Sequence, residues 1–213
     1  MGHDDEPSRP DIHPALAAFA ERVRALVAAT VTVSAPDAVL EQAAEEVAAI
    51  TARLESHVGE TPIPRYPKLV PTPLEPADVM PYDFVLGRYN PLAPPITFTW
   101  EDSKAIGRVT YTRPYEGPPG CVHGGVIAAA FDQVLSVANM MEGTPGPTAK
   151  LEFRYRHPTP LGVPLRFESW RTRLAGRRIH TTGRLLAGDQ VTVEAEGIFV
   201  SIPYEEVIRM LDR

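Results

Sequence analysis

The sequence predicts an α+β fold in which one antiparallel sheet packs against a single long helix, preceded by a helical hairpin. Six segments have the alternation or composition of strands, and short breaks with glycine or proline join the last four as antiparallel neighbours. Residues 123–141, between the second and third of these segments, are apolar on nearly every side. A helix of that composition needs cover on several sides, and a sheet packed against it provides such cover.

The N-terminal region predicts two helices. Residues 13–30 and residues 35–57 each carry apolar side chains at helical spacing, and Ser34 is the expected N-cap of the second helix. The break "TVTVSAPD" between them favours a helical hairpin. We assign residues 1–60 to this hairpin and interpret it as a packing surface, whose role as a lid, a dimer clasp or a partner dock stays open.

Residues 61–95 are rich in proline, which fixes φ and removes backbone donors. They are therefore expected to form an extended linker that wraps rather than folds alone. The remaining domain, residues 96–213, holds the sheet, the long helix and a short C-terminal helix from Tyr204. The expected strands are 96–100, 105–112, 148–157, 165–174, 178–186 and 190–202.

The composition is that of an ordinary globular protein of 213 residues with a net charge of −6. The single cysteine, Cys121, excludes an intrachain disulfide and a multi-cysteine metal site, and it fits a reducing compartment, so we expect a cytoplasmic protein. The opening "MGHDDEPSRP" lacks the apolar core of a secretory signal, and no run of eighteen apolar residues indicates a membrane span. The histidines show no metal-ligand spacing, so no metal is expected.

The charges are segregated along the chain. Residues 1–60 hold eleven acids and four basic residues, whereas residues 145–188 hold nine basic residues and two acids. The arginines fall inside strand patterns and follow no motif for reading nucleic acid, so no nucleic-acid partner is expected. A solvated strand face and a small polyanionic ligand, such as a nucleotide-bearing thioester, both remain as explanations.

The long helix begins with the stretch "EGPPGCVHGG". The amides of Gly124 and Gly125 lie in the first turn, where backbone N–H groups have no partner within the helix and the dipole is positive. No side chain blocks these amides, so they can meet a carbonyl oxygen as an oxyanion hole requires. The alternative is a tight helix start against which another chain packs.

A single carboxylate, Asp132, interrupts the apolar helix. Its burial costs several kcal/mol unless it is paired or functional, so it is either a hydrogen-bonded structural group or a general base or nucleophile. Eight residues separate it from Gly124, roughly 12 Å along a straight helix. One helix cannot easily bring both groups to the same carbonyl, but two antiparallel copies across a two-fold axis can. The sequence therefore suggests a homodimer with two composite sites.

His123-Gly124-Gly125 with Asp132, followed by "PTAKLEFRYRHPTPLG", resembles the hotdog-fold acyl-CoA thioesterases of the PaaI type. "EGPPGCVHGG" is most similar to the subgroup that includes the mammalian mitochondrial thioesterase-superfamily members. The resemblance covers about residues 82–203. It implies a hotdog fold, in which an antiparallel sheet wraps around one central helix, together with dimers that pair their sheets and sites at the dimer interface.

The resemblance also implies roles for single residues. Gly124 matches the amide that binds the thioester oxygen, and Asp132 matches the carboxylate that activates water or attacks directly. Thr148 matches a Ser/Thr that helps to position the water or the carboxylate, and His123 matches a catalytic-site histidine that mostly shapes the loop and can assist at the carbonyl. Gly117 is a departure, because many members carry asparagine there, which leaves one side-chain contact to thioester or water in doubt.

Arg154 and Arg156 are the candidates to meet the phosphates of CoA. They share a strand with Thr148 at even spacing, so all three side chains are expected on one face of the sheet. Arg177 and Arg178, in a turn, serve the same purpose equally well.

The expected activity is hydrolysis of acyl-CoA to free acid and CoA, with no cofactor. The alternative is a non-catalytic acyl-CoA or acyl-carrier binding module of the same fold. Cys121 lies too close to His123 in sequence for thiol catalysis, no G-x-S-x-G elbow or phosphate-binding glycine pattern occurs, and no second acid–histidine pair indicates a dehydratase. The acyl chain length and a pairing of dimers into a tetramer stay open.

Overall fold

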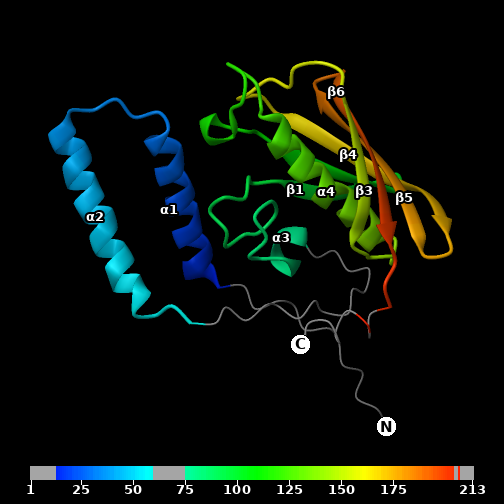
Figure 1. Cartoon of the computed structure of the whole chain (residues 1–213), viewed down its shortest axis with the longest axis horizontal. Coiled ribbons are helices and arrows are strands. Elements are labelled where there is room, and N and C mark those ends of the chain that lie inside the picture. The colour runs from blue at the N-terminus through cyan, green and yellow to red at the C-terminus, as the bar shows by residue number, and fades with distance from the viewer. Residues whose placement is uncertain (1–12, 60–74, 204–205, 207–213) are drawn as a thin grey trace, which may run out of the picture.

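The computed structural model describes residues 13–59, 75–203 and 206. One six-stranded antiparallel sheet, in the order β1-β2-β4-β5-β6-β3, packs against helix α4, and two N-terminal helices lie on the far side of that helix (Figure 1). The elements in chain order are α1 (Pro14–Thr30), α2 (Asp37–Glu55), α3 (Pro76–Val79), β1 (Thr97–Glu101), β2 (Lys104–Val109), the 3₁₀ turn η1 (Arg113–Tyr115), α4 (Gly124–Met141), β3 (Thr148–Tyr155), β4 (Leu165–Ala175), β5 (Arg178–Ala187) and β6 (Gln190–Val200).

This arrangement is the hotdog fold, and the predicted fold class is confirmed. All six expected strands are present and antiparallel, and the three longest expected helices are present within a few residues of their predicted ends. The N-cap prediction at Ser34 is wrong, because α2 begins at Asp37 with Pro36 as its N-cap and no side-chain cap. The helix expected from Tyr204 lies almost entirely outside the described residues, as do residues 60–74 of the expected linker.

The core lies between α4 and the inner face of the sheet. Phe131 of α4 stands at its centre, with its ring 5.0 Å from that of Phe167 on β4 and 6.0 Å from that of Phe153 on β3. Both Phe131 and Phe167 are fully buried. By length and composition α4 alone among the described helices could cross a membrane, but its packing in this core accounts for its apolar character.

Close packing between helix and sheet requires glycine on β5. A side chain at Gly183 would place its Cβ 2.9 Å from the Glu168 carbonyl oxygen and 3.0 Å from Leu135 of α4. The helix therefore rests directly on the backbone of the strand. A buried hydroxyl adds a polar contact beside this point, since Ser169 donates to the Val134 carbonyl oxygen at 2.8 Å.

The described part of the proline-rich segment packs onto the core through turns and the short helix α3. The Asp83 carboxylate accepts hydrogen bonds from the amides of Val85 and Leu86, both at 2.8 Å, and from Gln133 of α4 at 3.2 Å. Val85 and Leu86 are buried in the core. The division into residues 1–60, 61–95 and 96–213 stays a prediction, but residues 75–95 act structurally as part of the sheet domain.

Helix α1 contacts this segment through polar and apolar groups. The Arg24 guanidinium donates to the carbonyl oxygens of Ala93 at 2.9 Å and Asn90 at 3.1 Å, and Ala20 is buried. Helix α2, by contrast, stands at the edge of the molecule beyond α1 (Figure 1) and buries none of its residues. The hairpin is thus attached to the domain through one helix.

Replacing Phe131 by alanine is expected to lower the free energy of unfolding by about 3–5 kcal/mol, because it empties the centre of the aromatic core. Phe84→Ala, at a side chain that is 58% exposed, is the control and should change it by less than about 0.5 kcal/mol. Urea unfolding followed by circular dichroism measures both. Equal losses in the two variants would show that the core is not centred on Phe131.

Candidate active site

A compact turn leads into α4. The Gly117 amide donates to the Cys121 carbonyl oxygen at 2.9 Å, and the Glu116 carboxylate accepts from the Gly120 amide at 2.7 Å. This hydrogen bond from Gly120, together with the Arg113 guanidinium, holds the pKa of Glu116 below its ordinary value. Gly120 has a φ of 73°, which glycine adopts without strain, so the sequence "EGPPG" forms a closed loop.

The loop is tied to its surroundings at the point where the helix begins. The His123 amide donates to the Tyr115 carbonyl oxygen and the Val122 amide donates to the Thr159 carbonyl oxygen, both at 2.9 Å. A side chain at Gly117 would place its Cβ 2.8 Å from the His123 Cα. An asparagine at this position therefore has no room here, and Gly117 acts by letting the two segments lie in contact.

His123 is the N-cap of α4, and its side chain fixes one of the two glycine amides. Its Nδ1 accepts the hydrogen bond of the Gly125 amide at 2.9 Å. In a neutral imidazole the other nitrogen, Nε2, then carries the proton. Among the described residues the Gly124 amide donates to no acceptor. The geometry thus separates the glycines, because Gly125 completes the cap and Gly124 keeps a free N–H at the positive end of the helix.

Tyr155, at the end of β3, holds Gly124 in place. Its hydroxyl donates to the Gly124 carbonyl oxygen at 2.9 Å, and its ring lies 3.5 Å from where a Cβ of Gly124 would stand. Partial burial raises the pKa of this hydroxyl, which therefore stays a donor at neutral pH. Sequence reasoning missed Tyr155, because nothing in "LEFRYRH" separates it from the other side chains of the strand.

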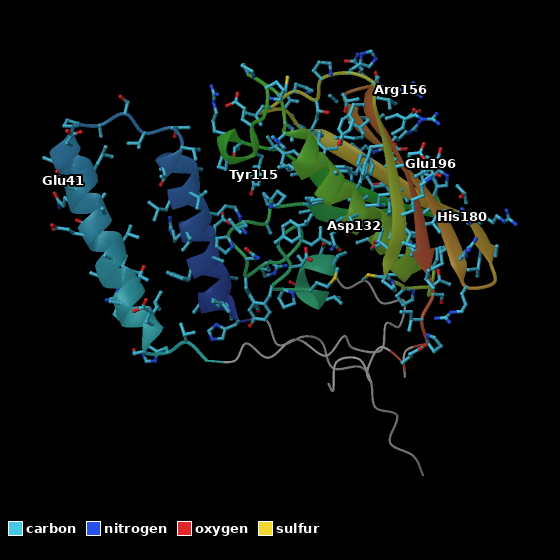
Figure 2. All side chains as sticks on the ribbon, viewed as in Figure 1. Glu41, Tyr115, Asp132, Arg156, His180 and Glu196 are labelled. Carbon is cyan, nitrogen blue, oxygen red and sulfur yellow. The ribbon has the colours of Figure 1, made fainter. Side chains whose placement is uncertain are left out.

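Asp132 lies two turns into α4 on the side that faces β3 (Figure 2). Thr148, the first residue of β3, donates its hydroxyl to Asp132 Oδ1 at 2.6 Å. Oδ2 has no hydrogen-bond partner among the described residues, and the side chain is half-buried. The two residues that the sequence singled out are therefore brought together, with one carboxylate oxygen held and the other open to a ligand.

An irregularity in β3 places Thr148 on the helix face. The pairing of β3 with β6 shifts register between Thr148 and Lys150, so Thr148 shares the inner face with Phe153 and Tyr155 despite the odd spacing. A bulge of this kind re-aims a side chain by one residue.

The same shift contradicts the expectation that Arg154 and Arg156 face the same side as Thr148. Arg154 and Arg156 line a groove on the outer face of the sheet, away from α4, and Arg156 lies on that side together with Glu196 and His180 in Figure 2. Arg156 pairs with Glu194 at 2.6 Å. Three arginines and three glutamates line this groove, so its charges balance.

No group of three or more histidine, cysteine, aspartate or glutamate side chains with metal-ligating geometry occurs in the part of the chain that the structure describes. Cys121 is half-buried in the turn before the helix, where its amide donates to the Pro118 carbonyl oxygen at 2.8 Å. The groups that can take part in a reaction at α4 are therefore the free amide of Gly124, the carboxylate of Asp132 and the hydroxyl of Thr148.

A central helix wrapped by six antiparallel strands, with a free amide at its start and a carboxylate two turns later, defines a hotdog-fold protein with a candidate carbonyl-binding site. The family model described as Thioesterase superfamily matches residues 119–194. The crystal structure of a thioesterase superfamily protein, RHA08564, is 37% identical, has a TM-score of 0.77, and the match covers 91% of this chain and 97% of that one. The chain belongs to the thioesterase superfamily.

Two curated relatives are similar over part of the chain's length. Acyl-coenzyme A thioesterase THEM4 of Xenopus laevis is 32% identical over 92 residues, which are 42% of this chain and 41% of that protein. The protein of the same name from Mus musculus is 30% identical over 93 residues, 43% of this chain and 40% of that protein. The chain thus matches about two fifths of the length of each curated relative.

Tyr155→Phe removes the donor to the Gly124 carbonyl and keeps the ring against the helix. We expect amide exchange in the first turn of α4 to become about threefold to tenfold faster, because a hydrogen bond of this kind contributes about 0.5–1.5 kcal/mol. Hydrogen exchange measured by mass spectrometry on peptides that cover the turn reports the change. Tyr82→Phe, on the segment before the sheet, is the control. Equal exchange rates in both variants would show that Tyr155 does not stabilise the first turn of α4.

Proposed function

We propose that the protein is an acyl-CoA thioesterase of the PaaI type, which hydrolyses acyl-CoA to a carboxylic acid and CoA. The observation that carries the proposal is the 2.6 Å hydrogen bond from Thr148 to Asp132, which orients a half-buried carboxylate on an otherwise apolar helix. A binding module has no need of such a group. The names of the curated relatives support the same substrate class, since both are acyl-coenzyme A thioesterases.

The reaction follows from the groups at α4. The thioester carbonyl oxygen accepts the Gly124 N–H, which polarises the carbonyl carbon. Asp132 Oδ2 takes a proton from a water molecule as the water oxygen bonds to that carbon, and the negative charge collects on the carbonyl oxygen. When the carbonyl re-forms, the C–S bond breaks and the CoA thiolate leaves. The proton on Asp132 returns to the thiolate, which gives the acid and CoA and restores the carboxylate.

Two roles for Asp132 fit this site, and the hydrogen bond from Thr148 favours the general base. With Oδ1 held by the hydroxyl, Oδ2 can accept from water without rotating. A direct attack would instead give an anhydride between Asp132 and the acyl group, which water then hydrolyses. Single-turnover hydrolysis in ¹⁸O-water separates the roles, because only the anhydride route can place ¹⁸O in the Asp132 side chain.

We infer that the active site forms between two copies of the chain. Strand β3 is at the edge of the sheet, and its outer edge has no strand partner among the described residues. Thr148, the first residue of β3, donates a hydrogen bond to Asp132. Tyr155, the last residue of β3, donates one to the Gly124 carbonyl oxygen. An antiparallel pairing of β3 with β3 of a second copy places the Asp132 end of one chain beside the Gly124 end of the other.

Other predicted roles continue as parts of this proposal. Gly125 completes the cap that orients Gly124, and Gly117 allows His123 to take its place. Arg154 is the better candidate for the CoA phosphates, because Arg156 is paired with Glu194. The cytoplasm is the proposed compartment, with the single cysteine as its support.

Asp132→Asn keeps the shape of the side chain and its acceptor for Thr148 but removes the base. We expect kcat/KM for acyl-CoA hydrolysis to fall by about 10²–10⁴. Thiol release from short, medium, long and aromatic acyl-CoAs is measured beside Asp189→Asn, a control in the exposed turn between β5 and β6. If the wild-type protein binds these esters but does not hydrolyse them, the protein is a binding module and the thioesterase proposal is wrong.

Mixing two inactive variants tests the composite site. Gly124→Val blocks the approach to the amide, and Asp132→Asn removes the base. If each site takes Gly124 from one chain and Asp132 from the other, a mixed dimer has one intact site, and equal mixtures should regain about a quarter of wild-type turnover after subunit exchange. Mixtures that stay as inactive as their parts, although exchange is shown by mass spectrometry, would place the site within one chain.

A further inference from the structure

Helix α2 carries an apolar surface that nothing in the described chain covers. All of its nineteen residues are exposed, and Leu40, Val47, Ile50 and Leu54 are each 41% exposed. Leu40, Ala43, Val47, Ile50 and Leu54 follow one another at alternating intervals of three and four residues. We call these five residues the α2 seam.

The spacing of the α2 seam indicates what kind of partner fits it. Alternating steps of three and four give an average of 3.5 residues, the repeat with which two helices pack side by side. A helix that packs on a sheet normally has a wider apolar face. Ala44 and Thr51, on one flank of the seam, are small and let another helix approach closely.

The polar side of α2 argues against a lipid surface. The helix holds five acids and one arginine, and Glu41 marks its acidic side in Figure 2. Helices that lie on membranes normally carry lysine and arginine on that side, because the lipid headgroups are often anionic. The seam therefore belongs to a contact between proteins.

The charges beside the seam are complementary to themselves. Glu46 and Arg53 lie on the same flank, seven residues apart, and therefore one above the other. When two copies of α2 pair in opposite directions, residues on this flank meet each other, so Glu46 of each copy approaches Arg53 of the other. A parallel pair sets Glu46 opposite Thr51 and forms no such ion pair.

We propose that the α2 seam binds the α2 seam of a second copy of this chain, with the two helices antiparallel. Glu41, Glu45 and Glu55 then lie away from the contact and stay in water, which limits the repulsion between two acidic helices. The pairing obeys two-fold symmetry, as an isologous contact must. It makes the hairpin a clasp between copies.

The clasp is too small to hold two chains alone. A stable protein interface buries at least about 1,200 Å² in total, and two seams of five residues, three of them with branched side chains longer than valine, fall short of this. The clasp is therefore one part of a larger contact between copies. Because α2 and β3 lie at opposite ends of the molecule (Figure 1), this contact joins a different pair of copies from the free edge of β3. Because it depends on no catalytic group, its failure and the failure of the thioesterase proposal are distinguishable.

Ile50→Glu in the full chain tests the clasp, since it places a carboxylate in the centre of the seam. Sedimentation equilibrium over a range of concentrations gives the dissociation midpoint of the assembly. We expect this midpoint to rise at least tenfold, while Ala52→Glu, the same charge change on the exposed back of the same helix, leaves it within about twofold. Circular dichroism and thioester hydrolysis verify that both variants are folded.

A charge exchange tests the direction of pairing. Glu46→Arg and Arg53→Glu each set like charges against one another across the two copies, so each should raise the midpoint at least threefold. The double variant Glu46→Arg/Arg53→Glu restores opposite charges and should return the midpoint to within about twofold of wild type. Recovery in the double variant is the result that supports an antiparallel pair.

Three results would overturn the proposal. The first is an Ile50→Glu midpoint equal to that of Ala52→Glu. The second is an unchanged midpoint with a lower melting temperature, which would mean that α2 closes on the exposed Phe19 and Leu26 of α1 in its own chain. The third is a double charge variant that is as weak as the single ones, since the charges would then not meet across two copies.

Discussion

The burial of α4 is the constraint on which the other parts of the structure depend. Val134, Leu135 and Phe131 of α4 are all fully buried, and one flat surface cannot bury so much of a helix. The sheet covers it on one side, and the segment that contains Val85 and Leu86 covers part of the other side. Backbone amides of that segment pair in turns, such as Gly87 with the Asp83 carbonyl oxygen at 2.8 Å and Tyr89 with the Pro81 carbonyl oxygen at 2.7 Å, so it can lie over the helix without pairing as a strand.

The candidate site lies on the part of α4 that neither the sheet nor this segment covers. The N-terminal turn of α4 projects beyond the cover, and so does the side of the helix next to β3, where the sheet ends. Gly124 and Asp132 occupy these two places. The strand that limits the cover also fixes both, because Thr148 and Tyr155 are the two ends of β3. One edge strand thus sets the geometry of the amide and of the carboxylate, and its free edge brings the halves of two chains within reach of each other.

The residue patterns predicted the fold class well and the site only in part. Alternation, glycine breaks and the apolar segment 123–141 were sufficient for six strands and the central helix, since each is a local consequence of burial on one face. Asp132 stood out because a carboxylate on an apolar helix needs a reason. Tyr155 and the face of Thr148 could not be found this way, because a register shift between Thr148 and Lys150 reverses the parity on which the argument from spacing relied. The same shift explains why Arg154 and Arg156 were expected on the wrong face.

A count of charged residues along the chain does not predict which charges are neutralised in the folded sheet. Residues 145–188 carry an excess of seven positive charges, yet the groove on the outer face of the sheet is lined by as many glutamates as arginines. Glu168, only 2% exposed, takes ion pairs from Arg166 at 2.7 Å and Arg184 at 2.8 Å, and Glu194 from β6 takes Arg156. Carboxylates of the same sheet therefore neutralise these three arginines, and one of these carboxylates, Glu194, lies outside the segment. An anionic ligand on this face would compete with an internal carboxylate for each of these three arginines. Arg154 has no ion-pair partner among the described residues, so an anion on this face would meet it at the lowest cost.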